Sequence, residues 1–527
     1  MYINNQLLIA KNDKKELAIL PRLVNRHGII TGASGSGKTT TVKVLSESMS
    51  AAGIPVFFVD VKGDLASIAK PGSPGVDFID KRVNELGLSE EGFTFQGFPV
   101  TFFDVFKKNG HPIRTTLSDI GPRLLSRMLS LSDSQEGNLA IAFQIAQDEN
   151  MKLNDLGDLR SLLNYVADNR NDYITKYGNI TSQSIATIQR NILMLQQEGG
   201  DNFFGKPELQ LFDLLQYDMN GKGFINILDA QELFKKPTLY ACFLIWLLNY
   251  LYDNCPEVGD LDRPKLALFL DEAHIIFNEM SPELIKNITQ IVKLIRSKGI
   301  GVYFISQSPS DIPEEILSQL GNKVQHVLRS YTPSDEKAVK AAANSFRTNP
   351  LFNTAEEIKS LATGEALVSF LNENGEPEIV ERAFILPPQS LNGTLSDGER
   401  QQIINSSRIY GKYENVNDEY SAAEIVTEAN KKKDEEKQAE LDAIAAEKQR
   451  IADEKAAEKA RKEEEKAAKE AEREAAKKKR EEEKAEREAE RERKNSVGYK
   501  LGKKVVNKTT DKVINKGLNS LFKNLFK

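Results

Sequence analysis

The sequence predicts an α/β fold in which a mainly parallel, doubly wound sheet carries an all-helical insertion and a long, charged C-terminal helix. Three observations predict this fold. Short continuous apolar runs, typical of parallel strands buried on both faces, alternate with segments of helical spacing over much of residues 1–390. Residues 117–217 show helical spacing without a strand-like run. Residues 431–494 are almost wholly Ala, Glu, Lys and Arg.

Composition and charge exclude several classes of protein. The 527 residues are 40% apolar, enough for a sizeable core, and a net charge of −6 gives no general attraction to nucleic acid. Cys242 and Cys255 lack metal-site spacing, so we expect buried or incidental thiols in a reducing compartment. Met1 leads into a polar segment instead of a secretory leader, and the apolar run Leu239–Leu251 is shorter than the ~20 residues that span a bilayer. We therefore expect a cytoplasmic protein with a buried helix at that run.

The strands are expected in the following order. Two alternating runs, Leu7–Ala10 and Leu17–Leu20, predict an N-terminal hairpin. Buried parallel strands are expected at 28–31, 56–60, 98–103, 223–228, 266–270 and 301–306. Later strands are expected at 324–329 and 365–370, the second turning at Asn374-Gly375 toward a partner around Ile379-Val380.

These elements divide the chain into five parts. We expect a core domain in residues 1–116 and 218–390, a helical insertion in 117–217, an extension of the core in 391–430, a charged helix in 431–494, and a basic amphipathic segment in 495–527. The insertion is interpreted either as a packing cap without chemistry or as a lid or partner-contacting subdomain.

A glycine-rich loop between the first parallel strand and a helix predicts a nucleotide site. The segment fits the P-loop pattern G-x-x-x-x-G-K-[ST] at every fixed position. The predicted nucleotide-contacting residues are Gly32, Ala33, Ser34, Gly35, Ser36, Gly37, Lys38 and Thr39, with Thr40 at the start of the helix. Backbone N–H groups and the helix N-terminus would bind the phosphates of ATP. Lys38 would reach the β- and γ-phosphates, and the Thr39 hydroxyl would hold Mg²⁺.

A second motif follows the apolar strand Leu266–Leu270. The strand ends in two carboxylates, Asp271 and Glu272, which is the Walker B pattern. Asp271 would support the Mg²⁺ shell, and Glu272 would orient and polarise the attacking water, because hydrolysis needs both a metal and a water-positioning group near the γ-phosphate. His274 is interpreted as structural in preference to catalytic.

Gln307 ends the strand that begins at Gly301. A side-chain amide at this place can contact both the γ-phosphate and the water, which is a sensor role. The alternative is an ordinary polar residue at a strand end.

Several motifs, taken together, resemble the bacterial HerA-like helicase C-terminal-domain family, a branch of the HerA/FtsK group of additional-strand, RecA-like P-loop motor ATPases. The matching segments are 26–28, 59–64, 271–274, 296–299, 306–313, 328–333, 337–342 and 407–413. The resemblance covers roughly 1–425. It implies a hexameric ring that couples ATP hydrolysis to movement on double-stranded DNA, with Lys38, Thr39, Asp271 and Glu272 as the hydrolytic set and Gln307 as the sensor.

The resemblance also implies an arginine that reaches a nucleotide at a subunit boundary, where a fixed cation offsets the developing phosphoryl charge. Arg296 occupies the slot after the Walker B helix, and Arg329 is the rival candidate; an ordinary salt bridge is the alternative for Arg329. The sequence departs from the family pattern at its N-terminal end, where HerA proteins carry a β-barrel that docks a nuclease. Residues 1–27 leave no room for it, which puts a partnership in DNA-end processing in doubt.

The C-terminal part is interpreted separately. Glu and Lys recur at i,i+4 spacing in residues 431–494, which favours a solvated single helix over a coiled coil or disorder. Apolar residues of the last segment share one helical face with lysines around it, so residues 505–527 could contact a membrane, DNA, a partner or the protein itself.

Two functions of different classes follow. The first is an ATP-driven ring motor that acts as a translocase or helicase on double-stranded DNA. The second is an ATP-controlled assembly switch or scaffold whose C-terminal arm binds a membrane or protein partner.

Overall fold

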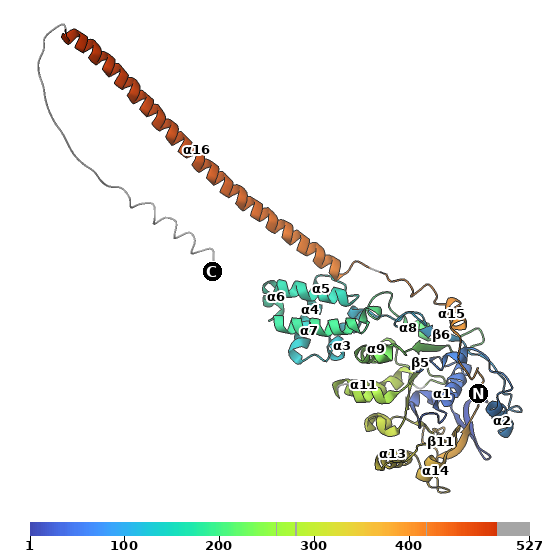
Figure 1. Cartoon of the computed structure of the whole chain (residues 1–527). Coiled ribbons are helices and arrows are strands. Elements are labelled where there is room, and N and C mark those ends of the chain that lie inside the picture. The colour runs from blue at the N-terminus through green and yellow to red at the C-terminus, as the bar shows by residue number, and fades with distance from the viewer. Residues whose placement is uncertain (260, 280–281, 418, 493–527) are drawn as a thin grey trace. The chain divides into compact units, whose positions relative to one another are not determined.

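The computed structural model describes residues 1–259, 261–279, 282–417 and 419–492 (Figure 1). The chain divides into two units, Met1–Lys431 and Lys432–Lys527. The first unit contains a twelve-stranded sheet whose main path runs β1-β2-β12-β11-β10-β4-β9-β8-β5-β7-β6, with β3 paired to β2.

Seven neighbouring strands of this sheet are parallel, and they form the half that carries the predicted motifs. In sheet order they are β10 (Asn322–Gln325), β4 (Gly28–Thr31), β9 (Ile300–Ser306), β8 (Leu266–Leu270), β5 (Val56–Asp60), β7 (Ile225–Asp229) and β6 (Val100–Phe103). The chain passes from β4 to β5 while β9 and β8 lie between them in the sheet. The segments that follow these four strands therefore meet at one edge, where ligands bind in open α/β sheets.

The remaining strands are antiparallel and extend the sheet beyond β10. They are β11 (Glu365–Ser369), β12 (Glu381–Ile385), β2 (Gln6–Lys11), β1 (Tyr2–Ile3) and β3 (Glu16–Ile19). β2 and β3 form the expected N-terminal hairpin. The partner of β11 begins at Glu381, slightly later than expected, and β10 ends four residues earlier than the strand predicted at 324–329.

Helices cover both faces of the parallel half, because alternate residues of each strand enter two separate cores. In β5, Phe57 and Val59 belong to one core, and Val56 and Phe58 to the other. The first core contains α9 (Pro237–Asn254), α10 (Ala273–Glu279) and α11 (Pro282–Ile295), and the second contains α1 (Lys38–Ala51) and α2 (Asp77–Glu85). The doubly wound α/β prediction is confirmed. Three helices, α12 (Glu314–Leu317), α13 (Pro333–Asn344) and α14 (Thr354–Ser360), lie between β9 and β11 in the chain.

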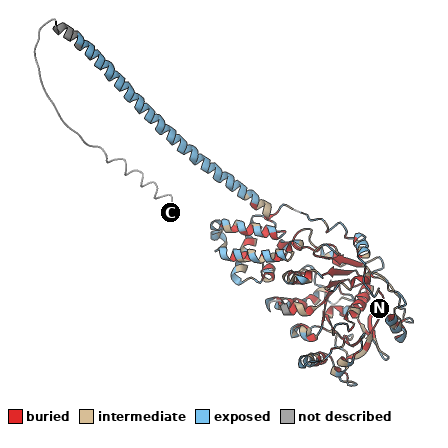
Figure 2. Cartoon of the chain, viewed as in Figure 1, coloured by how far each residue is buried: buried red, intermediate tan, exposed pale blue. Residues whose placement is uncertain are grey.

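Between β6 and β7 the chain forms helices only. They are α3 (Leu117–Met128), α4 (Asp133–Asp148), α5 (Leu156–Asp168), α6 (Arg170–Tyr177), α7 (Ser182–Gln197) and α8 (Leu211–Leu214). Side-chain caps start several of them: Thr116 accepts a hydrogen bond from Asp119 N, and Asp155 accepts one from Asp158 N. Their apolar faces share a core with α9, so these helices pack on the sheet domain. Figure 2 shows the buried residues on their inner faces.

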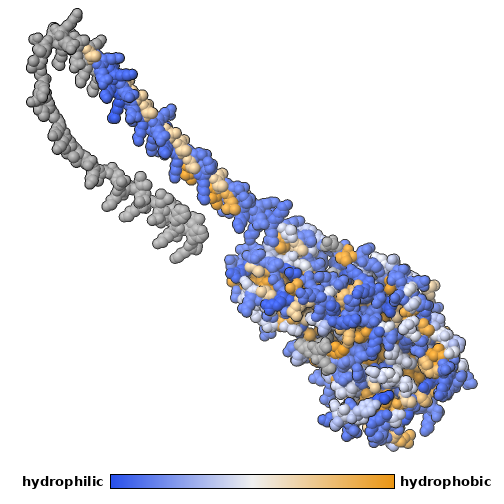
Figure 3. All heavy atoms as spheres, viewed as in Figure 1, coloured by the Kyte–Doolittle hydropathy of each residue, from blue (hydrophilic) through white to orange (hydrophobic). Residues whose placement is uncertain are grey.

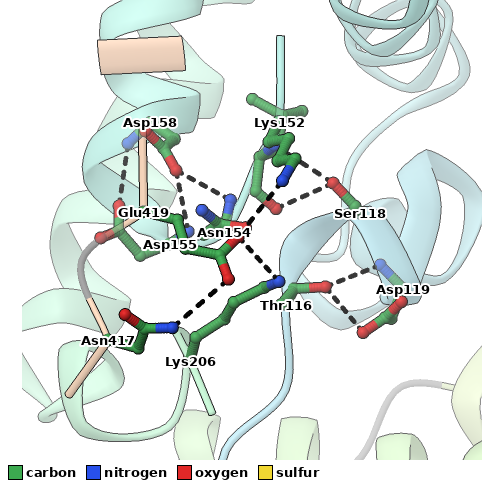
Figure 4. Close-up of polar contacts among 11 residues, drawn as sticks. Thr116, Ser118, Asp119, Lys152, Asn154, Asp155, Asp158, Lys206, Asn417 and Glu419 are labelled. Atoms are coloured by element: carbon green, nitrogen blue, oxygen red, sulfur yellow. Dashed lines mark hydrogen bonds and ion pairs between the residues drawn. The ribbon is translucent and has the colours of Figure 1, made fainter. Parts of the chain in front are cut away.

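Residues that follow Pro387-Pro388 pack back on the first unit. Helix α15 (Asp397–Asn405) brings Arg400 to Asp229 at 3.2 Å. Further on, Glu419 is paired with Lys152 at 3.2 Å and with Lys206 at 3.0 Å (Figure 4). This extension therefore contacts both the sheet and the helical insertion.

Helix α16 (Ala422–Glu492) follows directly. It begins nine residues before the charged segment predicted at 431–494. Two contacts cap its start: Glu424 accepts a hydrogen bond from Ser421 N at 2.9 Å, and Asp158 Oδ1 accepts one from Ala423 N at 3.1 Å. Residues 431–479 are all exposed. Leu441, Ile444 and Ile451 form a short apolar stripe on it, visible in orange in Figure 3. The basic amphipathic segment expected at 495–527 lies outside the described residues, and none of the described helices combines the length and apolarity needed to cross a membrane.

Candidate active site

The P-loop joins the end of β4 to the start of α1, as the sequence predicts. Gly32, Gly35 and Gly37 have positive φ angles of 153°, 74° and 112°, which glycine adopts without strain. Glycine is required at position 32 for a second reason, because a Cβ there would overlap the Cβ of His326. The loop therefore turns tightly enough to present backbone N–H groups to a phosphate.

Lys38 is buried and turned toward its own loop. Its Nζ donates hydrogen bonds to the carbonyl oxygens of Gly32 at 2.5 Å and Ala33 at 3.0 Å. Burial, followed by the nearby charge of Lys62, holds the pKa of Lys38 below its ordinary value. The Ser36 hydroxyl, also buried in the loop, has no hydrogen-bond partner among the residues that the structure describes. These are donor groups suited to phosphate oxygens.

The Walker B carboxylates follow β8 and lie beside the P-loop. Asp271 is 7% exposed and accepts a hydrogen bond from Glu272 N at 2.9 Å. It lines one small pocket together with Lys38 and Thr39. Burial raises the pKa of Asp271 to about 6, although the charge of Lys62 opposes the shift. The tertiary structure thus brings these three predicted site residues together.

Glu272 has an unusual backbone and two close neighbours. Its φ of 49° lies in the left-handed region, which costs a non-glycine residue roughly 1 kcal/mol or more. The Oε1 atom lies 2.5 Å from Lys62 Nζ. The Oε2 atom lies 3.2 Å from His274 Nδ1, but that nitrogen lacks a properly oriented hydrogen bond.

The oxygen donors of the pocket fit Mg²⁺. The Thr39 hydroxyl donates to Asp64 Oδ2 at 3.2 Å, and Asp271 supplies a second carboxylate in the same pocket. Hydroxyl and carboxylate oxygens suit this hard cation, which keeps most of its shell for water and phosphate. No cluster of three or more His, Cys, Asp or Glu side chains suited to a metal occurs in the part of the chain that the structure describes.

The sequence matches the "Helicase HerA-like C-terminal" family over residues 5–514. The chain belongs to this family. The resemblance inferred from the motifs is confirmed, and the chain is a HerA-like P-loop ATPase.

Known HerA-like proteins are distant relatives of this chain. The DNA double-strand break repair helicase HerA of Sulfolobus acidocaldarius is 23% identical over 380 residues, covering 68% of this chain and 65% of that protein. The DNA import protein CedB of the same organism is 21% identical over 356 residues, covering 67% and 51%. The chain thus spans slightly less than two thirds of the length of the HerA relative.

Two solved structures match part of this chain at low similarity. The plasmid coupling protein TrwB in complex with ADP and Mg²⁺ has a TM-score of 0.46 and 14% identity, covering 73% of this chain and 94% of TrwB. VirB4 of Thermoanaerobacter pseudethanolicus also has a TM-score of 0.46, with 16% identity, and the match covers 73% and 98%.

Two further residues predicted for the site, Gln307 and Thr40, lie close to the P-loop in the structure. Gln307 is exposed and directly follows β9, which lies between the P-loop strand β4 and the Walker B strand β8. Because Thr31 of β4 is in register with Ser306, Gln307 follows its strand at the same level as Gly32 follows β4. Thr40 is half-buried in the first turn of α1.

The two candidate arginines lie at opposite edges of the sheet. Arg296 precedes β9, whereas the P-loop follows the parallel strand β4, so the length of a strand, roughly 20 Å, separates Arg296 from its own phosphate site. Arg329 follows β10, and Ala33 N donates to Val327 O at 2.9 Å, which places the segment leading to Arg329 beside the P-loop. The Arg329 side chain is exposed and donates to Tyr331 Oη at 3.4 Å.

Several polar residues of the site, Lys62 among them, had no assigned role in the sequence. Asp64, which accepts from Thr39, stands in a matching motif but carries no chemical signal by itself. His326 is fully buried beneath the P-loop, with Nε2 2.8 Å from Thr41 Oγ1 and Nδ1 3.0 Å from Glu365 O. A lone histidine at a strand end gives no such signal, because its partners come from residues far away in the chain.

Proposed function

We propose that this HerA-like protein is an ATP-hydrolysing ring motor that acts as a translocase or helicase on double-stranded DNA. The observation that carries the proposal is the convergence of Lys38, Thr39, Asp271 and Glu272 from two motifs at one edge of the sheet. Relatives named as DNA repair helicases support DNA as the substrate.

In this proposal the P-loop binds the phosphates of ATP through its backbone N–H groups and Lys38. The Lys38 ammonium exchanges its two loop carbonyls for phosphate oxygens. Thr39 and Asp271 would hold Mg²⁺, which offsets phosphate charge when bound. Glu272 orients the attacking water and accepts its proton, and Gln307 contacts the γ-phosphate from the next strand.

The proposal includes a hexameric ring in which neighbouring subunits complete each site. Arg296 is too far from its own phosphate site to contribute there, because a strand length separates them. An arginine supplied by a neighbour would stabilise the developing phosphoryl charge and couple adjacent sites. Arg329, which follows β10 at the P-loop edge, is the second candidate for this role.

A second function is favoured by α16, a 71-residue helix that is exposed from residue 431 to 479. The exposed part of this helix adds no buried core, so it serves as a spacer or an arm. In this alternative, ATP binding controls assembly, and the arm presents a membrane- or partner-binding tip through residues 505–527.

The experiment that separates the two functions is steady-state ATP turnover with and without linear duplex DNA. Glu272→Gln protein is the blank for contaminating ATPases. Stimulation by duplex, together with duplex binding that weakens as salt rises, supports the motor. Turnover that is indifferent to DNA contradicts the motor and favours the assembly switch.

A further inference from the structure

Lys62 and Glu272 form an ion pair across the nucleotide pocket. The Nζ and Oε1 atoms are 2.5 Å apart. The two residues come from loops that follow the neighbouring parallel strands β5 and β8, in which Val59 is in register with Leu270. Both side chains therefore extend past the same edge of the sheet.

The ion pair involves the Glu272 carboxylate, which the proposed mechanism assigns to the attacking water. Glu272 Oε1 faces Lys62, and Oε2 lies beside His274 Nδ1 at 3.2 Å. The Glu272 side chain is 12% exposed and that of Lys62 is 47% exposed. Solvent thus reaches the lysine more readily than the glutamate, and Lys62 is the partner that can leave.

The backbone that carries Lys62 is held on both sides. The Asp60 carboxylate accepts hydrogen bonds from Gly63 N at 2.7 Å and Leu65 N at 3.1 Å. Gly63 has a φ of 77° and packs so closely on the Gln231 amide that a Cβ would overlap it. Breaking the ion pair therefore requires movement of the Lys62 side chain alone.

Lys62 is a second cation in the pocket and has a different task from Lys38. Lys38 is bound to the carbonyls of its own loop, whereas Lys62 is bound to the catalytic carboxylate. A carboxylate oxygen that is already bound by an ammonium is less available to hold a water molecule. The pair thus opposes the step assigned to Glu272.

We propose that Lys62 is a positioning residue that restrains Glu272 and so limits the basal rate of ATP hydrolysis. The inference rests on the proposed function, since it needs Glu272 to act on the attacking water. Glu272 orients the water only when Lys62 has left its Oε1 atom.

The test is steady-state ATP turnover of the full chain without DNA. Lys62→Met keeps an unbranched side chain of nearly the same length and removes its charge, and we expect kcat to rise about two- to fivefold with little change in KM for ATP. Lys62→Arg retains a cation and should keep the low rate. Lys293→Met is the matched control, because Lys293 forms a comparable ion pair with Glu315 at 2.8 Å on the surface, and it should leave the rate unchanged.

The possible outcomes separate this inference from the proposed function. An unchanged or lower kcat in Lys62→Met, with wild-type protein hydrolysing ATP, overturns the inference and leaves the proposed function standing. A variant that hydrolyses ATP when wild-type protein does not supports a complete restraint. If both proteins bind a fluorescent ATP analogue and neither hydrolyses ATP, the hydrolytic function fails and the inference falls with it.

Discussion

The Thr41 hydroxyl and the Nε2 atom of His326 lie 2.8 Å apart beneath the P-loop, and both residues are fully buried. His326 Nδ1 faces the carbonyl oxygen of Glu365, which only accepts hydrogen bonds, so Nδ1 carries the hydrogen and Nε2 accepts from Thr41. Together the two bonds join the first turn of α1, through His326, to the strand β11.

Replacing His326 should weaken nucleotide binding, although His326 acts through Thr41 and not by contact with the nucleotide. His326→Ala removes the partner of Thr41 and leaves a cavity, so we expect a loss of roughly 2–3 kcal/mol in unfolding free energy. We also expect ATP affinity to fall by about three- to tenfold. Urea unfolding and titration with a fluorescent ATP analogue measure the two effects. His326→Gln, which can still accept from Thr41, should restore part of both, and equal losses in the two variants would contradict the role of the hydrogen bond.

We expect His326 to make the unfolding free energy depend on pH. Burial lowers the pKa of His326 to about 4 in the folded protein, against an ordinary value of 6.5. Between these pH values the unfolded chain binds more protons at His326 than the folded protein does. The contribution of the neutral His326 to the unfolding free energy is therefore complete above pH 6.5 and is lost as the pH falls toward 4.

The difference in unfolding free energy between wild-type protein and His326→Gln should shrink by about 1–2 kcal/mol from pH 7 to pH 5. Paired urea titrations at the two pH values measure it. Because both proteins keep His27 and the carboxylates, their titration cancels in the comparison. A constant difference would show that His326 does not titrate in this range.

Lys38 and Glu272 should separate binding from hydrolysis. Lys38→Ala removes the cation of the P-loop, and we expect ATP binding to be abolished. Glu272→Gln keeps the shape of the side chain but cannot accept the water proton, so ATP should bind normally while kcat falls by about 100-fold or more. Isothermal titration and turnover assays measure the two effects, and equal loss of binding in both variants would contradict the role of Glu272.

The arginine that acts between subunits can be identified by mixing variants. Arg296→Ala should lower kcat by about 100-fold or more with ATP affinity retained, because its charge acts on the transition state. A mixture of Arg296→Ala and Glu272→Gln subunits should regain activity. In the mixed ring, the intact Glu272 of an Arg296→Ala subunit lies beside the intact Arg296 of a neighbouring Glu272→Gln subunit. The same pair of assays on Arg329→Ala is the comparison. Complementation that appears only with Arg329→Ala would assign the role to Arg329.

Arg400 should stabilise the first unit through a buried ion pair. Its guanidinium lies 3.2 Å from Asp229, whose side chain is 5% exposed. Arg400→Met leaves that carboxylate without its cation, so we expect a loss of roughly 2–4 kcal/mol in unfolding free energy. Arg450→Met, which breaks an exposed pair with Glu447 on α16, is the matched control and should cost less than about 0.5 kcal/mol. Similar small losses in both would show that the Arg400 pair contributes little.

Local patterns were sufficient for the main elements of the fold. The buried runs at β5 and β8, the helix at 239–251 and the two phosphate-site motifs all depend on neighbours within a few residues, which the sequence displays directly. The charged helix predicted from residue 431 begins earlier, at Ala422, where a local pair of Ser421 and Glu424 is joined by a cap from Asp158 in another part of the chain. Long-range caps leave no local pattern.

By itself, the sequence determined the α/β class, the P-loop and the Walker B carboxylates, because spacing and residue type encode these features within short segments. Only the tertiary structure decided that Lys62 meets Glu272, that His326 supports Thr41, and that Arg296 lies a strand length away from its own P-loop. Each of these relationships depends on the order of strands in the sheet. That order arises from burying both faces of the sheet at once, a property of the whole chain that no single segment carries.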